Sequence, residues 1–391
     1  MKILVLSSLA YSLVNFRGEL LAEMRKQGHE VVAVAPDWDA EVADQLGKSQ
    51  IPLRHVPMSR TGTNPVRDAW TMLCYLRLMR AERPDIVLAY TQKPIIYGGI
   101  AARIYGRAGF FALMSGLGYL FSDEARGLAL VKRLFVRLYR AGLRRARKVF
   151  VFNKDDRADM IAAGIIGEDH FVLQVPGSGV DTRHFTAEAS ASTEITFLMI
   201  SRLMRDKGVH DFVKAAELVA ARHPQVRFQI LGRVEPDNRT GIDAEEIAKL
   251  AARYPVEFLP ETRDIRPHLA ACSVFVLPSY YREGLPRTIL EALAAGRPVI
   301  TTDMPGCRDP IEPGVNGLLI PPRSPVALAD AMCRLIENKG DLAQMSRRAR
   351  ETAVKFYDVR LVNRILLASM GLLRSGALAN QPALRLLTDA A

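Results

Sequence analysis

The sequence predicts an α/β protein made of two doubly wound domains, each a parallel sheet covered by helices. Short β-branched runs alternate with longer amphipathic stretches along the whole chain, a pattern typical of parallel sheets buried on both faces. The alternation restarts near residue 194, after a stretch at 176–193 that is rich in Gly, Ser, Thr and Ala. A single eight-stranded barrel would instead show evenly spaced units without such a linker.

Strand-like runs in the sequence predict the number of sheets. The first half has such runs at 2–7, 29–35, 85–90 and 148–153. The second half has them at 195–201, 226–232, 256–260, 274–279, 298–302 and 317–321. Amphipathic periodicity predicts helices between them, at 16–26, 66–80, 95–107 and 289–295.

The restart sets the expected domain boundaries. We expect an N-terminal Rossmann-like domain at 1–180 and a C-terminal one at 181–357, facing each other across a cleft. A helix is expected at 358–374, packing back towards the N-terminal domain. The remaining tail, 375–391, has weak periodicity and is assigned no function.

Composition limits the class of protein. The chain has 391 residues, 49% of them hydrophobic, and a formal net charge of +11, which excludes wholesale disorder. No apolar run approaches the roughly 18 residues of a membrane-spanning helix. The four cysteines are scattered, which fits a reducing compartment. The positive charge is compatible with a nucleic acid, a membrane surface or an anionic substrate.

The charge is concentrated in one segment. Residues 1–180 hold 25 Lys and Arg against 17 Asp and Glu, and residues 126–148 hold nine basic residues and no acidic one. We interpret 126–148 as one basic amphipathic helix of the kind that lies on anionic lipid. The alternative is a solvated face on a packed helix. At about 100° per residue, the basic stripe comprises Arg133, Arg137, Arg140, Arg144 and Lys148.

The residues most suggestive of chemistry lie at 279–306. Glu283 stands in a turn with Gly and Pro, and Glu291 follows eight residues later in a predicted helix. That spacing is roughly 12 Å along a helix, too far for a close acid–base pair. The two carboxylates suit two points of an elongated ligand, with the helix N-terminus between them facing a phosphate. The alternative is a helix on which Glu291 pairs with a nearby Arg.

Segment 279–306 resembles the nucleotide-sugar site of family 4 glycosyltransferases, retaining enzymes of the two-domain GT-B fold. The shared features are an E-G-x-P turn, E-x7-E, A-x-G-x-P-V-I and a P-G turn. A second family motif, ISRLMRDKGV, stands at 200–209 and carries Arg202 and Lys207. The resemblance implies that this pair contacts the donor diphosphate, where fixed cations offset the charge of the leaving group.

The resemblance also implies roles for further residues of the C-terminal domain. Glu283 acts in catalysis with Arg202 and Lys207 and meets the sugar hydroxyls, while Glu291 meets the ribose. The turn at 259–279 lies near the nucleobase or ribose. The implied donor-binding residues are Glu291, Gly232, Glu261, Thr262, Gly284, Leu285 and Arg287.

The N-terminal domain is expected to bind the acceptor. Its candidate residues follow predicted strands, and the carboxyl ends of parallel strands form the ligand-binding edge of such a sheet. They are Asn15, Arg17, Gly18, Lys93, Tyr97, Gly116, Gly118 and Tyr119. Many family members carry a histidine in the loop occupied here by residues 115–118, so no catalytic histidine is assigned. The implied chemistry is same-face attack assisted by the departing phosphate.

Residues 1–373 resemble one branch of the family, which acts on undecaprenyl-diphosphate-linked sugars and includes N-acetylgalactosaminyltransferases. The resemblance implies a UDP-sugar donor, with N-acetylgalactosamine as first choice, and a polyprenyl-diphosphate-linked acceptor. It also implies a peripheral protein on the cytoplasmic face of the bacterial inner membrane. No cofactor is expected, and no metal, because the fold that the resemblance implies needs no divalent ion.

Three other functions are alternatives to a glycosyltransferase. A GT-B nucleotide-sugar epimerase would share fold and donor but need no lipid acceptor. A nicotinamide-dependent oxidoreductase requires G-x-G-x-x-G after the first strand, and residues 7–16 do not contain it. A nucleic-acid-binding protein is disfavoured because no recognition motif is present and the basic residues are concentrated beside an apolar face.

Overall fold

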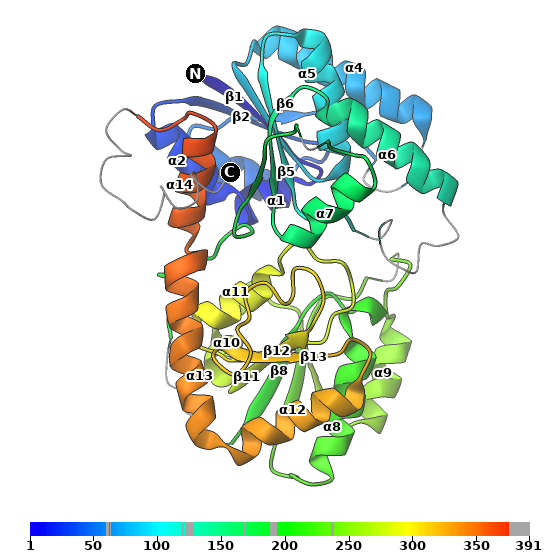
Figure 1. Ribbon diagram of the computed structural model, residues 1–391, viewed down its shortest axis with the longest axis vertical. Coiled ribbons are helices and arrows are strands. Elements are labelled where there is room, and N and C mark those ends of the chain that lie inside the picture. The colour runs from blue at the N-terminus through cyan, green and yellow to red at the C-terminus, as the bar shows by residue number, and fades with distance from the viewer. Residues whose placement is uncertain are drawn as a thin grey trace. The chain divides into compact units, whose positions relative to one another are not determined.

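The computed structural model describes residues 1–59, 62, 64–118, 121, 129–167, 169–187, 194–235 and 238–374. Residues 1–178, with the described chain after 359, form one compact unit, and residues 179–359 form the other (Figure 1). Each unit contains one fully parallel sheet. The α/β class and the two doubly wound, Rossmann-like sheets are therefore confirmed.

The first unit has a seven-stranded sheet in the order β3-β2-β1-β4-β5-β6-β7. The chain starts in the middle of this sheet and reverses direction after β3, which makes the carboxyl ends of β1 and β4 a switch point. The strands are β1 Lys2–Leu6, β2 Glu30–Ala35, β3 Leu53–His55, β4 Ile86–Tyr90, β5 Gly109–Met114, β6 Ala146–Val151 and β7 Val172–Gln174.

Helices cover both faces of this sheet. In Figure 1, α2 lies to the left of the strands, and α4, α5 and α6 lie to the right. Both α4 and α6 contact η1–α5, a five-residue π-helix that continues into α5, so the three form one layer. The helices are α1 Ala10–Asn15, α2 Gly18–Lys26, α3 Ala40–Lys48, α4 Pro65–Glu82, η1 Pro94–Gly98, α5 Gly99–Tyr105, α6 Ala129–Leu143, α7 Lys154–Ala162 and α14 Val359–Ser369.

Two glycines set the spacing within this helical layer. A Cβ on Gly99 would lie 2.2 Å from the carbonyl oxygen of Gly142, and a Cβ on Gly142 would lie 2.8 Å from that of Ile96. Neither backbone can move away without breaking its helix, so both positions require glycine. This contact holds α6 against η1.

The prediction of one helix over 126–148 is wrong at its C-terminal end. α6 ends at Leu143, Arg144 lies in the turn that follows, and Lys148 belongs to β6, opposite Phe111 of β5. The physical reason is that residues 146–151 satisfy their backbone hydrogen bonds in the sheet, between β5 and β7. Residues 126–128 lie outside the described part of the chain. The stripe on α6 is therefore shorter than predicted and does not include Lys148.

The second unit has a six-stranded sheet in the order β10-β9-β8-β11-β12-β13. All six strand-like runs of this half of the sequence form strands of this sheet. Its strands are β8 Thr196–Ile200, β9 Arg227–Leu231, β10 Glu257–Leu259, β11 Val274–Leu277, β12 Val299–Thr302 and β13 Gly317–Ile320.

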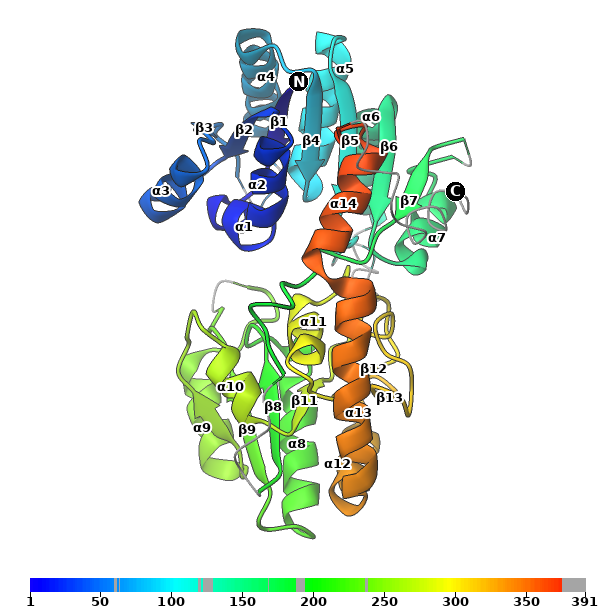
Figure 2. The same ribbon diagram turned by 90° about the vertical axis from the view of Figure 1, so that its left-hand side faces the viewer.

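Helices also flank the second sheet (Figure 2). Two short elements are relevant to function: η4, a single 3₁₀ turn after β8, and α11, which begins directly after the Glu283 turn. The elements are η4 Arg205–Lys207, α8 Val209–Ala220, α9 Ala244–Arg253, α10 Arg266–Ala271, α11 Arg287–Ala294, α12 Pro325–Glu337, α13 Lys339–Thr352 and the π-helix η5 Ala353–Tyr357.

Candidate functional site

The two family-like motifs of the second unit meet at the carboxyl edge of its sheet. After β8 the chain makes the η4 turn and ends it at Gly208, whose φ is +83°. A Cβ on Gly208 would lie 2.2 Å from the carbonyl oxygen of Pro278, which directly follows β11. Glycine is therefore needed for both the backbone conformation and the close approach of the two loops.

This approach joins Lys207 to Glu283 in an ion pair. Both side chains are largely buried, with 10% of Lys207 and 13% of Glu283 exposed. The Ser279 hydroxyl also donates to Glu283 Oε1 at 3.3 Å, and the ring centroid of Tyr281 lies 5.2 Å from Lys207 Nζ. A cation and a carboxylate 76 residues apart in sequence are thus held side by side.

The backbone around Asp206 fixes this pair. The N–H groups of Tyr280 and Tyr281 donate to the Asp206 carbonyl oxygen at 2.9 and 3.1 Å. The P-G turn of the 279–306 segment packs against the turn that carries Glu283. There, Gly306 has a φ of +80°, and a Cβ on it would lie 2.5 Å from the carbonyl oxygen of Glu283. The family-like glycine is required because the two turns are packed backbone to backbone.

Glu291 forms a different pair, one turn along α11. Arg287 Nε lies 2.9 Å from Glu291 Oε1, as the alternative interpretation of the sequence expects. Burial raises the pKa of Glu291 to about 7, while the nearby Arg287 acts in the opposite direction. A carboxylate of this kind changes its charge near neutral pH, which is unusual for glutamate.

Local packing explains why position 232 is a glycine. A Cβ on Gly232 would lie 1.8 Å from the carbonyl oxygen of Ser201, where the loops after β8 and β9 run together. The Ser201 N–H donates to Leu231 O at 3.1 Å. This contact demands glycine whether or not a ligand also approaches here.

The other predicted donor residues differ in their burial and contacts. Arg202 and Glu261 are exposed, and among the described residues their side chains make no hydrogen bond or ion pair. The Thr262 hydroxyl accepts from Asp264 N–H at 3.2 Å within its own turn. Of the residues that follow Glu283, Gly284 is buried, and Leu285 packs against the core of this unit.

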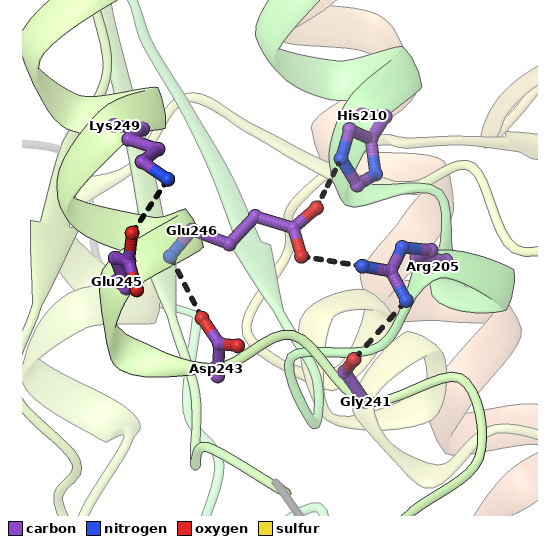
Figure 3. A network of polar contacts seen from close by, with 7 residues as sticks. All are labelled: Arg205, His210, Gly241, Asp243, Glu245, Glu246 and Lys249. Atoms are coloured by element: carbon purple, nitrogen blue, oxygen red, sulfur yellow. Dashed lines mark hydrogen bonds and ion pairs between the residues drawn. The ribbon is translucent and has the colours of Figure 1, made fainter.

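A charge network beside η4 was missed by the sequence analysis. Glu246 Oε2 lies 2.5 Å from Arg205 Nη2, and Oε1 lies 2.9 Å from His210 Nε2, so one carboxylate joins η4, α8 and α9 (Figure 3). Asp243 accepts from the Glu246 N–H at 2.8 Å. The D-x-x-E pattern of residues 243–246 signals a helix start but says nothing about Arg205, because the partner depends on how the 233–243 loop folds.

In the first unit, two predicted acceptor residues belong to a buried network. Lys93 Nζ lies 2.7 Å from Asp68 Oδ1, and the Tyr97 hydroxyl donates to Asp68 Oδ2 at 2.8 Å. The side chains of Lys93 and Asp68 are only 8% and 9% exposed. Burial and the bond to Asp68 raise the pKa of Tyr97, which keeps its hydroxyl neutral. Asp68 was not among the predicted residues.

Backbone strain lies close to this network. Thr91 follows β4 with a φ of +68°, which is unfavourable for a β-branched residue. Its Oγ1 is buried, and no hydrogen-bond partner for it is found in the described part of the chain. Strained residues of this kind persist where the surrounding structure holds them, and here the loop leads directly into η1.

The remaining acceptor candidates differ in setting. Arg17 is buried, with its guanidinium 5.3 Å from the ring centroid of Tyr90 and 5.8 Å from that of Phe152. Asn15 ends α1 and Gly18 begins α2, where a Cβ would meet only Val14 at 4.0 Å. The loop glycines have positive φ, +115° for Gly116 and +69° for Gly118. Tyr119 lies outside the described residues.

The described residues contain neither a metal-binding cluster nor a membrane-spanning helix. No group of three or more His, Cys, Asp or Glu is placed to hold a metal ion there. In the same part of the chain, none of the helices combines the length and the apolar content that crossing a bilayer requires.

Comparison with known families assigns both units. Residues 14–175 match the family described as "Glycosyl transferase 4-like domain", and residues 194–338 match "Glycosyl transferases group 1". Fold and matches together define a glycosyltransferase of the two-domain GT-B class. More narrowly, the chain belongs to the family 4 type of these enzymes, with a 4-like N-terminal half and a group 1 C-terminal half, which confirms the resemblance found in the sequence.

Individual relatives are similar along most of the chain. Over 379 residues the chain is 23% identical to N,N'-diacetylbacillosaminyl-diphospho-undecaprenol alpha-1,3-N-acetylgalactosaminyltransferase of Campylobacter jejuni, covering 94% of this chain and 97% of that protein. It is 25% identical to UDP-Gal:alpha-D-GlcNAc-diphosphoundecaprenol alpha-1,3-galactosyltransferase of Escherichia coli, covering 78% and 79%. The crystal structure of Anabaena HepE with UDP-glucose has a TM-score of 0.77 at 21% identity, covering 95% and 100%. This structural likeness supports the GT-B fold.

Proposed function

We propose that this glycosyltransferase moves a sugar from a UDP-sugar to a saccharide carried on undecaprenyl diphosphate, in the assembly of a bacterial surface or protein-linked glycan. The sugar is a hexose or N-acetylhexosamine, with N-acetylgalactosamine as first candidate. The relatives in C. jejuni and E. coli are named for acceptors of this class, and HepE has been crystallised with UDP and UDP-glucose. The observation that carries the proposal is the Lys207–Glu283 pair at the carboxyl edge of the second sheet.

The pair suggests how the donor is held. Lys207 is paired with the Glu283 carboxylate. In our mechanism the donor diphosphate takes the place of that carboxylate, and Arg202 joins Lys207 on the phosphate oxygens. Glu283 is then released to accept hydrogen bonds from the sugar hydroxyls. The cations offset the negative charge that grows on the diphosphate as the glycosidic bond breaks, an interaction that is strongest in the transition state.

Other residues serve binding in this proposal. Ionised Glu291 accepts hydrogen bonds from the ribose hydroxyls, and Arg287 keeps that carboxylate in place. Gly232, Gly284 and Leu285 line the donor site, while Glu261 and Thr262 border the base. In the first unit the acceptor diphosphate is held at the edge that carries Arg17, Lys93 and the loop glycines. Transfer proceeds with retention, the acceptor hydroxyl attacking from the face that the diphosphate leaves, without a metal ion.

A lipid-linked acceptor requires contact with a membrane. We propose a peripheral location at the cytoplasmic face of the inner membrane, supported by the exposed Arg133 and Arg137 of α6. Arg140 contributes less, because its Nε donates to Gly164 O at 2.7 Å. Arg144 lies just beyond the helix end.

The test is an activity screen. The protein is incubated with a panel of UDP- and GDP-sugars, with and without an undecaprenyl-diphosphate-linked saccharide, and in buffer with a chelator. We expect acceptor-dependent release of UDP and a product whose anomeric configuration, measured by NMR, equals that of the donor. Conversion of the donor sugar without acceptor would instead identify an epimerase. An absence of transfer from every donor would refute the proposal.

A further inference from the structure

On the exposed side of α4, residues spaced three or four apart form a line along the helix, and the first half of this line is apolar. Val66, Trp70 and Leu73 recur at helical spacing, and 77%, 48% and 42% of their surfaces are exposed. The opposite side of the helix is buried in the core of the first unit through Tyr75, Leu76 and Met79. These three apolar side chains are therefore left uncovered by the unit itself, although the helix already has a complete buried face.

The second half of the same line is basic. Arg77 and Arg80 continue the spacing and are exposed, as is Arg67 beside the line. The Arg77 guanidinium lies 5.1 Å from the Trp70 ring centroid. The two acids of α4 do not contribute to this surface, because Asp68 is buried with Lys93 and Glu82 is paired with Lys2 and Arg54. Every exposed charge on the described face of α4 is thus an arginine.

The neighbouring helix α6 repeats this arrangement. Leu130 and Leu134 are 78% and 52% exposed in its first half, and the exposed Arg133 and Arg137 lie on the same side. α4 and α6 flank η1–α5 on one face of the sheet, as Figure 1 shows. Along the chain α4 connects the parallel strands β3 and β4, and α6 connects β5 and β6, so the first, apolar halves of both helices lie towards the carboxyl edge of the sheet.

We infer that α4 is a membrane-docking helix, which lies on an anionic bilayer with Val66, Trp70 and Leu73 in the headgroup–acyl boundary and its arginines among the phosphates. Trp beside Leu and Arg on one exposed face is typical of interfacial helices. A second copy of this chain is a poorer occupant, because it would set rows of arginine against each other. The inference rests on the proposed function for its partner, and it places the bilayer beside the acceptor edge of the first unit.

The two tryptophans of the chain provide the test. Trp38, 65% exposed, stands between β2 and α3, a helix that contacts α1, and Trp70 stands on α4. Trp38→Phe leaves Trp70 as the only tryptophan, and Trp70→Phe leaves Trp38. Vesicles of phosphatidylcholine with 30 mol% phosphatidylglycerol, as a roughly physiological anionic fraction, are added to each. We expect a blue shift and quenching by brominated acyl chains for Trp70, and neither for Trp38.

Flotation with the same vesicles measures the energetic contribution. Val66→Ser/Leu73→Ser is expected to weaken partitioning at least tenfold, since two apolar side chains are no longer buried in the bilayer. The matched control is Leu218→Ser/Val326→Ser, which removes side chains 45% and 62% exposed on α8 and α12 of the second unit and leaves partitioning unchanged. Arg77→Gln/Arg80→Gln is expected to remove most of the preference for anionic over neutral vesicles.

Several other results would contradict the inference. Flotation without any change in Trp70 emission overturns it, and so does a concentration-dependent blue shift without vesicles, which would indicate self-association. Equal loss in the control double variant also overturns it. Donor turnover is measured in parallel without vesicles, with the undecaprenyl-diphosphate-linked saccharide as acceptor. A wild-type protein that uses no nucleotide sugar but still shifts Trp70 emission would refute the proposed function and leave the docking helix standing.

Discussion

The two sheet edges that carry the candidate residues are built differently. At the edge of the second unit, Lys207 and Glu283 form an ion pair beside turns that are fixed by backbone contacts, and in our proposal the donor diphosphate displaces the carboxylate. At the edge of the first unit, Lys93 is held by a buried Asp68 that also binds Tyr97. The comparison shows two settings for a basic residue that follows a strand: Lys207 pairs with one carboxylate in a turn, whereas Lys93 belongs to a buried network that also binds Tyr97.

The largest expected effect tests the structural half of this comparison. Asp68→Asn leaves the Lys93 ammonium buried without a counter-ion, and breaking a buried pair typically costs about 3–5 kcal/mol. We expect the free energy of unfolding, measured by urea denaturation, to fall by an amount of this order. The double variant Asp68→Asn/Lys93→Met removes both charges and is expected to recover most of the loss. A fully stable Asp68→Asn protein would show that Lys93 is not tied to Asp68 in solution.

The second effect tests the ligand-binding half. Lys207→Ala and Glu283→Ala are each expected to lower turnover by about 10²-fold or more, because each removes a contact made to developing charge. Glu283→Gln separates the two roles. It removes the competing carboxylate from Lys207, so UDP is expected to bind at least as tightly as to the wild type, by calorimetry, while turnover falls. Weaker UDP binding in Glu283→Gln would argue against displacement of the carboxylate by diphosphate.

The difference between the two edges also explains what could be predicted from sequence. The motif at 279–306 was recognisable because its glycines are demanded by backbone contacts, as at Gly306 and Gly208, so the letters and the geometry are coupled. The strands of the second sheet were all predicted, because apolar runs buried on both faces, such as β8, β11 and β12, leave little ambiguity, although β10 is only partly buried. In the first sheet, β3, β5 and β7 were not predicted as strands. β3 and β7 have three residues each, and the run of β5 has few β-branched residues.

Partners of charged side chains were the least predictable feature. Asp68 and Lys93 are 25 residues apart, and Glu246 and Arg205 are 41 apart. Each pairing depends on a loop whose path no local pattern specifies. The error at Lys148 has the opposite origin: the basic residues continued a helical period by chance, while the backbone entered β6. The spacing of side chains alone does not show where the backbone stops forming helical hydrogen bonds and begins to bond to neighbouring strands.

A smaller effect is expected from the network beside η4. Glu246→Gln weakens the link to Arg205, two residues from Lys207, and loosens the turn that presents the ammonium. We expect KM for the donor to rise several-fold, up to about tenfold, with little change in kcat, as for loss of a positioning contact. The matched control is Glu245→Gln on the same helix, which breaks only the exposed pair with Lys249. An equal effect in both variants would assign the change to α9 as a whole.

The smallest effect is a pH dependence that sharpens the role of Glu291. Burial gives this carboxyl a pKa of about 7 in the folded protein against an ordinary value of 4.5, so the folded state favours the protonated form. Its contribution to stability is therefore greatest below pH 4.5 and is lost as the pH rises towards about 7. Urea unfolding at pH 5 and pH 8 is expected to show this decline in the wild type and a smaller one in Glu291→Gln.

Donor binding should change in the opposite direction. Ribose hydroxyls bind best to the ionised carboxylate, so KM for the donor is expected to fall a few-fold between pH 6 and pH 8, around a pKa of about 7. In Glu291→Gln the KM should be higher and independent of pH across that range. Arg287→Gln is a second test. Removal of the cation raises the pKa of Glu291 further, so the fall in KM is expected to move to higher pH. A wild-type KM that does not change with pH would mean that the Glu291 carboxylate does not contact the donor.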